Sequence, residues 1–211
     1  MTDGKALSAQ DRVAGVLSRV RIAVAAGVDW VQIREKDLPA RELLALARAS
    51  VRIAAEIRSG EARVIVNDRL DVALAAGAAG VHLGGESLSA REVVRWCRRG
   101  NVPADFLIGV SSHSIEQARE AESAGANYVF FGPIFDTPSK MAFGPPQGIP
   151  KLAEVCSAVR IPVIAIGGVN EENGTECLRA GAAGVAAIRL FQEPGELADL
   201  KSAIGRLHHA N

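Results

Sequence analysis

The chain has 211 residues, of which 48% are hydrophobic and 23% charged, so it can bury a sizeable core and is not a disordered segment. Its 24 Lys and Arg balance its 24 Asp and Glu, which excludes a strongly basic nucleic-acid-binding domain and requires that any anion site be local. The three cysteines are scattered without a Cys-x-x-Cys pair, no apolar run reaches ~20 residues, and the N-terminus does not resemble a signal peptide. These features predict a cytoplasmic protein without membrane or nucleic-acid partners.

The chain alternates between helical stretches and short β-rich runs, and it begins with a helix. Apolar residues at helical spacing predict that first helix over residues 9–26. We expect strands at residues 28–33, 63–66, 80–83, 106–110, 128–131, 161–166 and 184–188. We expect the remaining helices at residues 43–51, 70–76, 90–98, 115–124, 149–159, 173–180 and 196–208.

The predicted strands are apolar rather than alternating, as expected of parallel strands that are buried on both faces. Their regular alternation with helices predicts one (β/α)₈ TIM barrel over residues 1–211, with a doubly wound open sheet as the alternative. Such a barrel needs a strand before its first helix, and only residues 1–3 are available for it. The first strand is therefore either truncated at the N-terminus, which is our hypothesis, or replaced by a neighbouring element.

Active sites of TIM barrels lie at the carboxyl ends of the strands. After the first predicted strand, alternation places Gln32, Arg34 and Lys36 on one side, so a donor and two cations face the same way. This arrangement suits a multiply charged anion, although a solvated cluster of charges is the alternative. After the next strand, Asp68 either caps the following helix or, beside Asn67, suits Mg²⁺, which prefers one or two carboxylates plus phosphate oxygens.

A second anion zone is predicted further along the chain. Glycines at 167 and 168 follow a strand and let backbone N–H groups approach a phosphate closely. The backbone at Ile188, where the last strand ends, is expected to contribute to the same phosphate site. A long loop over residues 132–148, with Thr137, Ser139 and Lys140, reads as a lid over a phosphorylated ligand. A barrel with both zones should bind a diphosphate and a monophosphate and join or exchange something between them.

Several segments together resemble the thiamine-phosphate synthase family. They are QIREK at 32–36, NDR at 67–69, GVHLG at 80–84, GVSSH at 109–113, GPIF at 132–135, TPSK at 137–140 and AIGG at 165–168. They occur in the family's order over essentially the whole chain, and residues 2–3 resemble the tail of the family's first strand. The resemblance implies a transferase that joins hydroxymethylpyrimidine diphosphate to thiazole phosphate. Diphosphate leaves first, and the thiazole nitrogen then attacks a pyrimidine carbocation.

The resemblance also implies roles for individual residues. Those expected to contact the pyrimidine diphosphate are Gln32, Arg34, Lys36, Asn67, Ser111 and Lys140, of which Arg34, Lys36, Ser111 and Lys140 would be catalytic. Those expected to line the thiazole phosphate site are Thr137, Pro138, Ser139, Gly168, Ile188 and Arg189. Mg²⁺ would bind Asp68 and, at a position where the family usually has a second Asp, Ser87.

Two alternatives stay open at this point. TenI-like thiazole tautomerases resemble the chain, but they carry a catalytic His where this sequence has Pro133, and they lack the Asp found here as Asp68. A non-catalytic, phosphate-binding regulatory barrel is the other reading, because a fold does not by itself determine a function. The family's usual Ser at the end of the last strand is Arg189 here. Apolar outer helix faces allow a homodimer.

Overall fold

A computed structural model describes residues 1–2, 12–58, 60–100, 102–137, 145–191 and 197–208 of the chain. The strands in this part are β1 (Trp30–Ile33), β2 (Arg63–Asn67), β3 (Gly80–Leu83), β4 (Leu107–Ser112), β5 (Tyr128–Phe131), β6 (Val163–Ile166) and β7 (Gly184–Ala186). The helices are α1 (Arg12–Ala26), α2 (Ala40–Arg58), α3 (Leu70–Ala76), α4 (Ala90–Arg99), α5 (Ile115–Ala124), α6 (Gly148–Ala158), α7 (Gly174–Arg179), α8 (Leu197–His208) and the 3₁₀ helix η3 (Arg189–Phe191).

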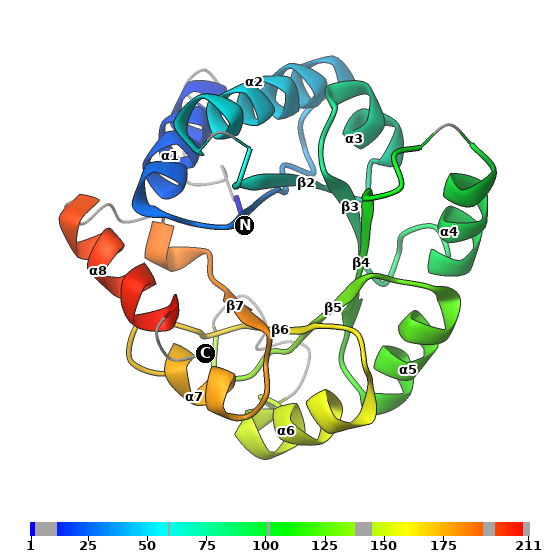
Figure 1. Cartoon of the computed structure of the whole chain (residues 1–211), viewed down its shortest axis with the longest axis vertical. Helices are drawn as coiled ribbons and strands as arrows, with labels where there is room; N and C mark the ends of the chain where they lie inside the picture. Colours follow the sequence, from blue (N-terminus) through cyan, green and yellow to red (C-terminus); the bar gives the residue numbers. More distant parts are fainter. Residues whose placement is uncertain (3–11, 59, 101, 138–144, 192–196, 209–211) are drawn as a thin grey trace.

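The seven strands form one parallel sheet in the order of the sequence, from β1 to β7. Figure 1 shows this sheet curled into an open barrel with the helices in an outer ring. The prediction of an α/β, TIM-barrel-like fold is therefore confirmed, with seven parallel strands in the described part of the chain. The main differences lie at element ends, because α2 is longer than expected and β7 is shorter.

Side chains along each strand point alternately outward, under the helices, and inward, into the barrel. Side chains such as Val64 and Val66 point outward and pack in a core beneath the helices, and both are at most 3% exposed. Side chains such as Trp30 and Tyr128 point inward, where their rings meet edge to face with centroids 4.9 Å apart. Burial on both faces explains the continuous apolar runs that the sequence shows.

The gap between β7 and β1 is entered by the first two residues. The Thr2 amide donates to the Gln32 carbonyl at 2.7 Å, and the Thr2 hydroxyl accepts from the Arg34 amide at 2.8 Å. On the other side, the Met1 amine donates to the Ala187 carbonyl at 3.4 Å. Thr2 thus lies where the tail of a first strand was expected, while the hypothesis of a truncated start stays a prediction.

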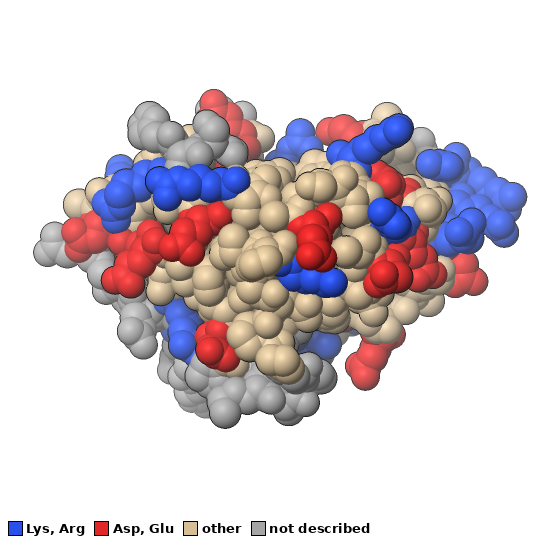
Figure 2. Space-filling model, turned by 90° about the horizontal axis from the view of Figure 1, so that it is seen from below, with Lys and Arg blue, Asp and Glu red and all other residues tan. Residues whose placement is uncertain are grey.

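The molecular surface is mixed in charge, as the balanced composition suggests. On the face in Figure 2, blue Lys and Arg side chains are interspersed with red Asp and Glu side chains. Cys97, Cys156 and Cys177 are free thiols. Within the described ranges, no helix is both long and apolar enough to cross a membrane.

Candidate active site

The parallel sheet brings the predicted site residues to one end of the barrel. Arg34 follows β1, Asp68 follows β2 and Gly168 follows β6. Because every neighbouring pair of strands is parallel, the carboxyl ends of all seven strands lie at the same rim. The two anion zones predicted from the sequence therefore open onto one side of the molecule.

Two amides link the ends of β1 and β2. Gln32 points into the barrel, is 5% exposed and donates from Nε2 to Asn67 Oδ1 at 3.1 Å. Asn67 in turn donates from Nδ2 to Asp68 Oδ2 at 2.9 Å. The Gln32 Oε1 atom is buried without a hydrogen-bond partner. A buried acceptor left open at a barrel mouth costs free energy unless a ligand donates to it.

Asp68 has a backbone conformation that few non-glycine residues adopt. Its φ is +63°, and its amide donates to the His82 carbonyl at 2.9 Å. The Oδ1 atom of its carboxylate accepts from the Ser87 hydroxyl and from the Gly84 amide. The residue at the N-cap of α3 is Arg69 rather than Asp68. Asp68 therefore does not act as a simple helix cap, because its carboxylate is held across the rim by the loop after β3.

His82 lies inside the barrel and is 2% exposed. Its Nε2 is 2.9 Å from Ser111 Oγ, its Nδ1 is 3.2 Å from the Tyr128 hydroxyl, and its ring centroid is 4.2 Å from that of Phe130. Burial lowers the pKa of His82 to about 3, with the Asp68 charge opposing this shift and the Arg34 charge adding to it. Burial also raises the pKa of Tyr128. At neutral pH the imidazole and the phenol are both uncharged, and the His82 ring, held by Tyr128, contacts the Ser111 hydroxyl.

Sequence reasoning missed His82 and Tyr128 as site residues. One signal could have found His82, since alternation along β3 turns it into the barrel, and its register partner on β2 is Asn67. The pairing of His82 with Tyr128 joins residues 46 positions apart, and no local pattern encodes it.

Arg34 and Lys36, which are also expected to contact the pyrimidine diphosphate, follow β1. Arg34 is partly buried, and Lys36 is exposed in the segment between β1 and α2. Pro138, Ser139 and Lys140 lie outside the described residues. Thr137, which directly precedes them, is partly buried.

The backbone after β6 approaches the segment after β5 very closely. Gly167 and Gly168 have φ values of +95° and +70°. A Cβ on Gly168 would lie 2.7 Å from both the Asp136 carbonyl oxygen and the Phe135 Cβ, so a larger residue cannot be accommodated without movement. Asn173 Nδ2 donates to the Gly168 carbonyl at 3.0 Å. The helix expected here, α7, begins only at Gly174.

The end of the last strand lies across the same rim. Ile188 is partly buried, and Arg189 is exposed as the first residue of η3. Within the described ranges, no group of three or more His, Cys, Asp or Glu side chains could hold a metal ion. Asp68 is the carboxylate that β2 and β3 bring to the rim, and Ser87 lies against it.

Comparison with known proteins identifies the family. The family model described as thiamine monophosphate synthase, TMP-TENI, matches residues 7–191. The chain belongs to this family. A relative from Geobacter sulfurreducens is 50% identical over 173 residues, covering 82% of this chain and 78% of the relative. The thiamine-phosphate synthase of Methanoculleus marisnigri is 44% identical over 177 residues, covering 84% and 80%.

The thiamine-phosphate synthase family also includes a solved structure that is similar throughout. The thiamine phosphate pyrophosphorylase from Pyrococcus furiosus superposes with a TM-score of 0.80 at 31% sequence identity. The match covers 99% of this chain and 92% of the other. The fold and the family that the sequence motifs predicted are thus both confirmed.

Proposed function

We propose that this member of the family is a thiamine-phosphate synthase, a transferase of thiamine biosynthesis. It joins hydroxymethylpyrimidine diphosphate and thiazole phosphate and releases diphosphate. The observation that carries the proposal is the open, buried acceptor Gln32 Oε1, whose side chain is linked through the Asn67 amide to the Asp68 carboxylate at the same end of the barrel. The exocyclic amine of the pyrimidine is a donor of the kind that this acceptor requires.

The negative charge of the departing diphosphate must be balanced by positive charge, and the cationic residues that follow the first strand and lie in the long loop would provide it. Arg34 is close enough to His82 to lower its pKa, which places positive charge near the barrel interior. We propose that Arg34, Lys36 and Lys140 bind the diphosphate, since charge-assisted hydrogen bonds to phosphate are roughly twice as strong as neutral ones. Asn67 and the Ser111 hydroxyl, oriented by His82, donate further hydrogen bonds.

Asp68 and its partners fit Mg²⁺. The oxygen atoms at this point are those of the Asp68 carboxylate and the Ser87 hydroxyl, which are the hard ligands that Mg²⁺ prefers. Asp68 would be the main ligand, with Ser87 beside it, and the remaining positions would be filled by diphosphate oxygens and water. When bound, Mg²⁺ neutralises charge on the leaving oxygens. The neutral Ser87 in place of a second carboxylate predicts weaker affinity for the ion.

The second substrate is held on the other side of the rim. We propose that the backbone around Gly168 and Ile188 binds the thiazole phosphate, together with Thr137, Pro138, Ser139 and Arg189. The positive φ values of Gly167 and Gly168 support this, because glycine lets backbone N–H groups approach an anion closely.

Positioning is the main catalytic contribution of this arrangement. The two anion zones hold the pyrimidine and the thiazole by their phosphates at one mouth, which aligns the thiazole nitrogen with the carbon that loses diphosphate. Bond breaking precedes attack, so the fixed cations and hydrogen-bond donors act where negative charge develops on the leaving group.

A two-substrate assay tests the proposal. On mixing both substrates with the purified protein we expect Mg²⁺-dependent release of diphosphate together with formation of thiamine phosphate. Proton exchange on a thiazole carboxylate phosphate without diphosphate release would instead indicate a tautomerase. Tight binding of both phosphorylated ligands without either reaction would indicate a regulatory barrel and overturn the proposal.

A further inference from the structure

Two aromatic rings form a floor below the rim of the barrel, and Phe130 contributes one of them. Phe130 points inward, because it lies two residues after Tyr128 on β5 and is the register partner of Ser111 on β4. Its ring centroid is 4.2 Å from that of His82, which is the other ring of the floor. Phe130 is 8% exposed, whereas Tyr128, one step deeper in the barrel, is 1% exposed. The Phe130 ring therefore lies nearer to the mouth.

Glycines above both rings keep the floor open toward the mouth. The next position on the inner face of β5 is Gly132, where a Cβ would overlap the Ile166 carbonyl oxygen. The position two residues after His82 is Gly84, where a Cβ would lie 3.9 Å from Asp68 Oδ1. Neither β3 nor β5 thus places a side chain between its ring and the rim, and the Asp68 carboxylate lies above the floor.

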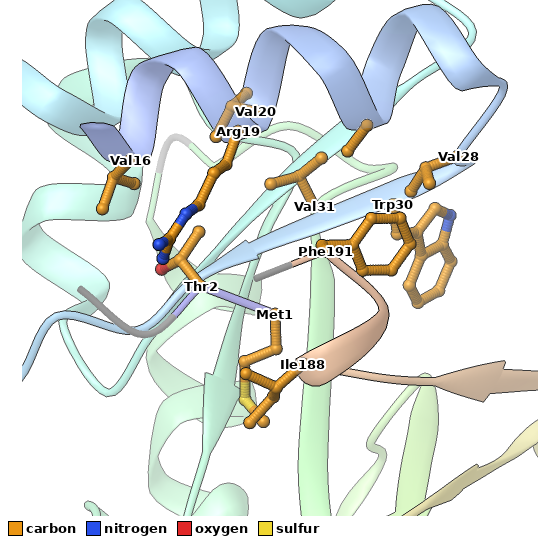
Figure 3. Close-up of a pocket in the computed structure, with 11 residues that line it drawn as sticks. Met1, Thr2, Val16, Arg19, Val20, Val28, Trp30, Val31, Ile188 and Phe191 are labelled. Atoms are coloured by element: carbon orange, nitrogen blue, oxygen red, sulfur yellow. The ribbon is translucent and has the colours of Figure 1, made fainter. Parts of the chain in front are cut away.

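The layer beneath the floor is filled by further aromatic rings. The Tyr128 ring lies below Phe130, with centroids 5.6 Å apart, and packs edge to face against Trp30. Trp30 also borders an apolar pocket beside α1, together with Phe191 (Figure 3). Neither His82 nor Phe130 lines that pocket. The ring beneath Phe130 is therefore Tyr128, and the pocket beside α1 does not deepen the floor.

The pyrimidine substrate of the proposed function, on which this inference rests, would reach this floor with one particular group. Its diphosphate leaves from the methylene on C5, its amine is on C4, and its methyl group is on C2, directly opposite C5. The diphosphate is held at the rim near Asp68, and the amine meets the open acceptor Gln32 Oε1 at the side. The C2 group therefore points away from the rim, toward the rings of His82 and Phe130.

We propose that Phe130 determines the size of the group that the site accepts at C2 of the pyrimidine. A methyl group suits this position, because an aromatic ring offers apolar contact and requires no hydrogen bond in return. A longer group does not fit, because the Phe130 ring has the His82 ring beside it and the Tyr128 ring beneath it. Closely packed interiors of this kind yield little to added methylene groups.

The experiment compares two pyrimidine diphosphates, which carry a methyl or a propyl group at C2, in four proteins. These are the parent chain, Phe130→Ala, Phe130→Leu and Phe131→Leu. Phe131 is the matched control, because it is the next residue on β5 but points outward into the core beneath the helices. Phe130→Leu is included because it changes the packing less than Phe130→Ala and so keeps the test available if the alanine variant does not fold.

The readout is the ratio of kcat/KM for the methyl compound to kcat/KM for the propyl compound, in which any loss common to both substrates cancels. We expect the parent to favour the methyl compound at least about tenfold, which is the lower end of what one methylene contributes in an apolar pocket. Phe130→Ala should reduce this ratio at least about tenfold and Phe130→Leu by less, whereas Phe131→Leu should leave it unchanged. An unchanged ratio in the Phe130 variants, or an equal change in Phe131→Leu, would overturn the inference.

Calorimetric titration of both compounds, with Mg²⁺ and without thiazole phosphate, separates this inference from the proposed function. The ratio of their dissociation constants should shift in the same direction in the Phe130 variants. If it shifts but no protein forms thiamine phosphate, the proposed function is wrong and the role of Phe130 is supported. If thiamine phosphate forms and neither ratio shifts, the role of Phe130 is wrong and the proposed function is supported. Failure of the parent to bind either compound would overturn both.

Discussion

Gly109 on β4 lies against the ring of Tyr128, and its replacement by alanine tests how tightly the barrel interior is packed. A Cβ at this position would lie 2.0 Å from Tyr128 Cζ and 2.4 Å from its hydroxyl oxygen. The ring cannot simply move away, since Tyr128 is 1% exposed, contacts the ring of Trp30 and is hydrogen-bonded to His82. Gly109→Ala must therefore displace either the ring or the strand.

The cost of Gly109→Ala can be estimated from these contacts. Overpacking a filled core costs roughly 1–3 kcal/mol, and losing the hydrogen bond between Tyr128 and His82 adds roughly 0.5–1.5 kcal/mol. We expect a loss of roughly 2–4 kcal/mol in the free energy of unfolding, which lowers the Tm of a protein of this size by roughly 4–16 °C. Urea denaturation followed by circular dichroism measures the free energy, and calorimetry measures the Tm.

Gly184→Ala is the matched control for this prediction. Gly184 also lies on a strand of the same sheet, but nothing comes within 4 Å of a Cβ added there. We expect this variant to be as stable as the parent or slightly more stable, because alanine loses less backbone entropy on folding. If Gly109→Ala destabilises no more than Gly184→Ala, the interior is not packed as described and the reasoning is wrong.

Four further outcomes follow from the site. Asp68→Ala should reduce the turnover of both substrates by at least about 10–100-fold, whereas Asp71→Ala, an exposed carboxylate paired with Arg69, should leave the rate unchanged in a steady-state assay. Ser87→Asp should lower the Mg²⁺ concentration that gives half the maximal rate, and an unchanged titration would show that Ser87 lies away from the ion. Gly168→Ala should raise KM for thiazole phosphate more than KM for the pyrimidine substrate, and equal effects would count against separate anion zones. The pKa of His82 is about 3 in the folded protein against 6.5 in the unfolded chain, so the free energy of unfolding should fall as the pH drops below 6.5. Relative to a His82→Gln variant, we expect a loss of about 3 kcal/mol at pH 4.5. Urea titrations of the two proteins at several pH values measure this, and a difference in stability that does not depend on pH would contradict it.

Much of the fold follows from local patterns in the sequence. The strands at Gly80–Leu83 and Tyr128–Phe131 and the helices at Leu70–Ala76 and Ile115–Ala124 have the predicted bounds. Residues with a clear local preference mark such boundaries, as at Ser114, whose hydroxyl accepts from the Gln117 amide at the start of its helix. Element ends without such residues, as in α2, were predicted less well because packing determines them.

The sequence alone determined that strands and helices alternate, that the strands are parallel, and that polar residues such as Arg34 and Asp68 follow strand ends at a shared rim. These features depend on periodicity and on residues close in the chain. Only the tertiary structure decided that Ser87 holds the Asp68 carboxylate, that His82 is buried uncharged between Ser111 and Tyr128, and that Phe130 packs against the His82 ring. Those contacts join segments far apart in the chain, so they depend on how the sheet curls and how closely its side chains pack, which no local pattern specifies.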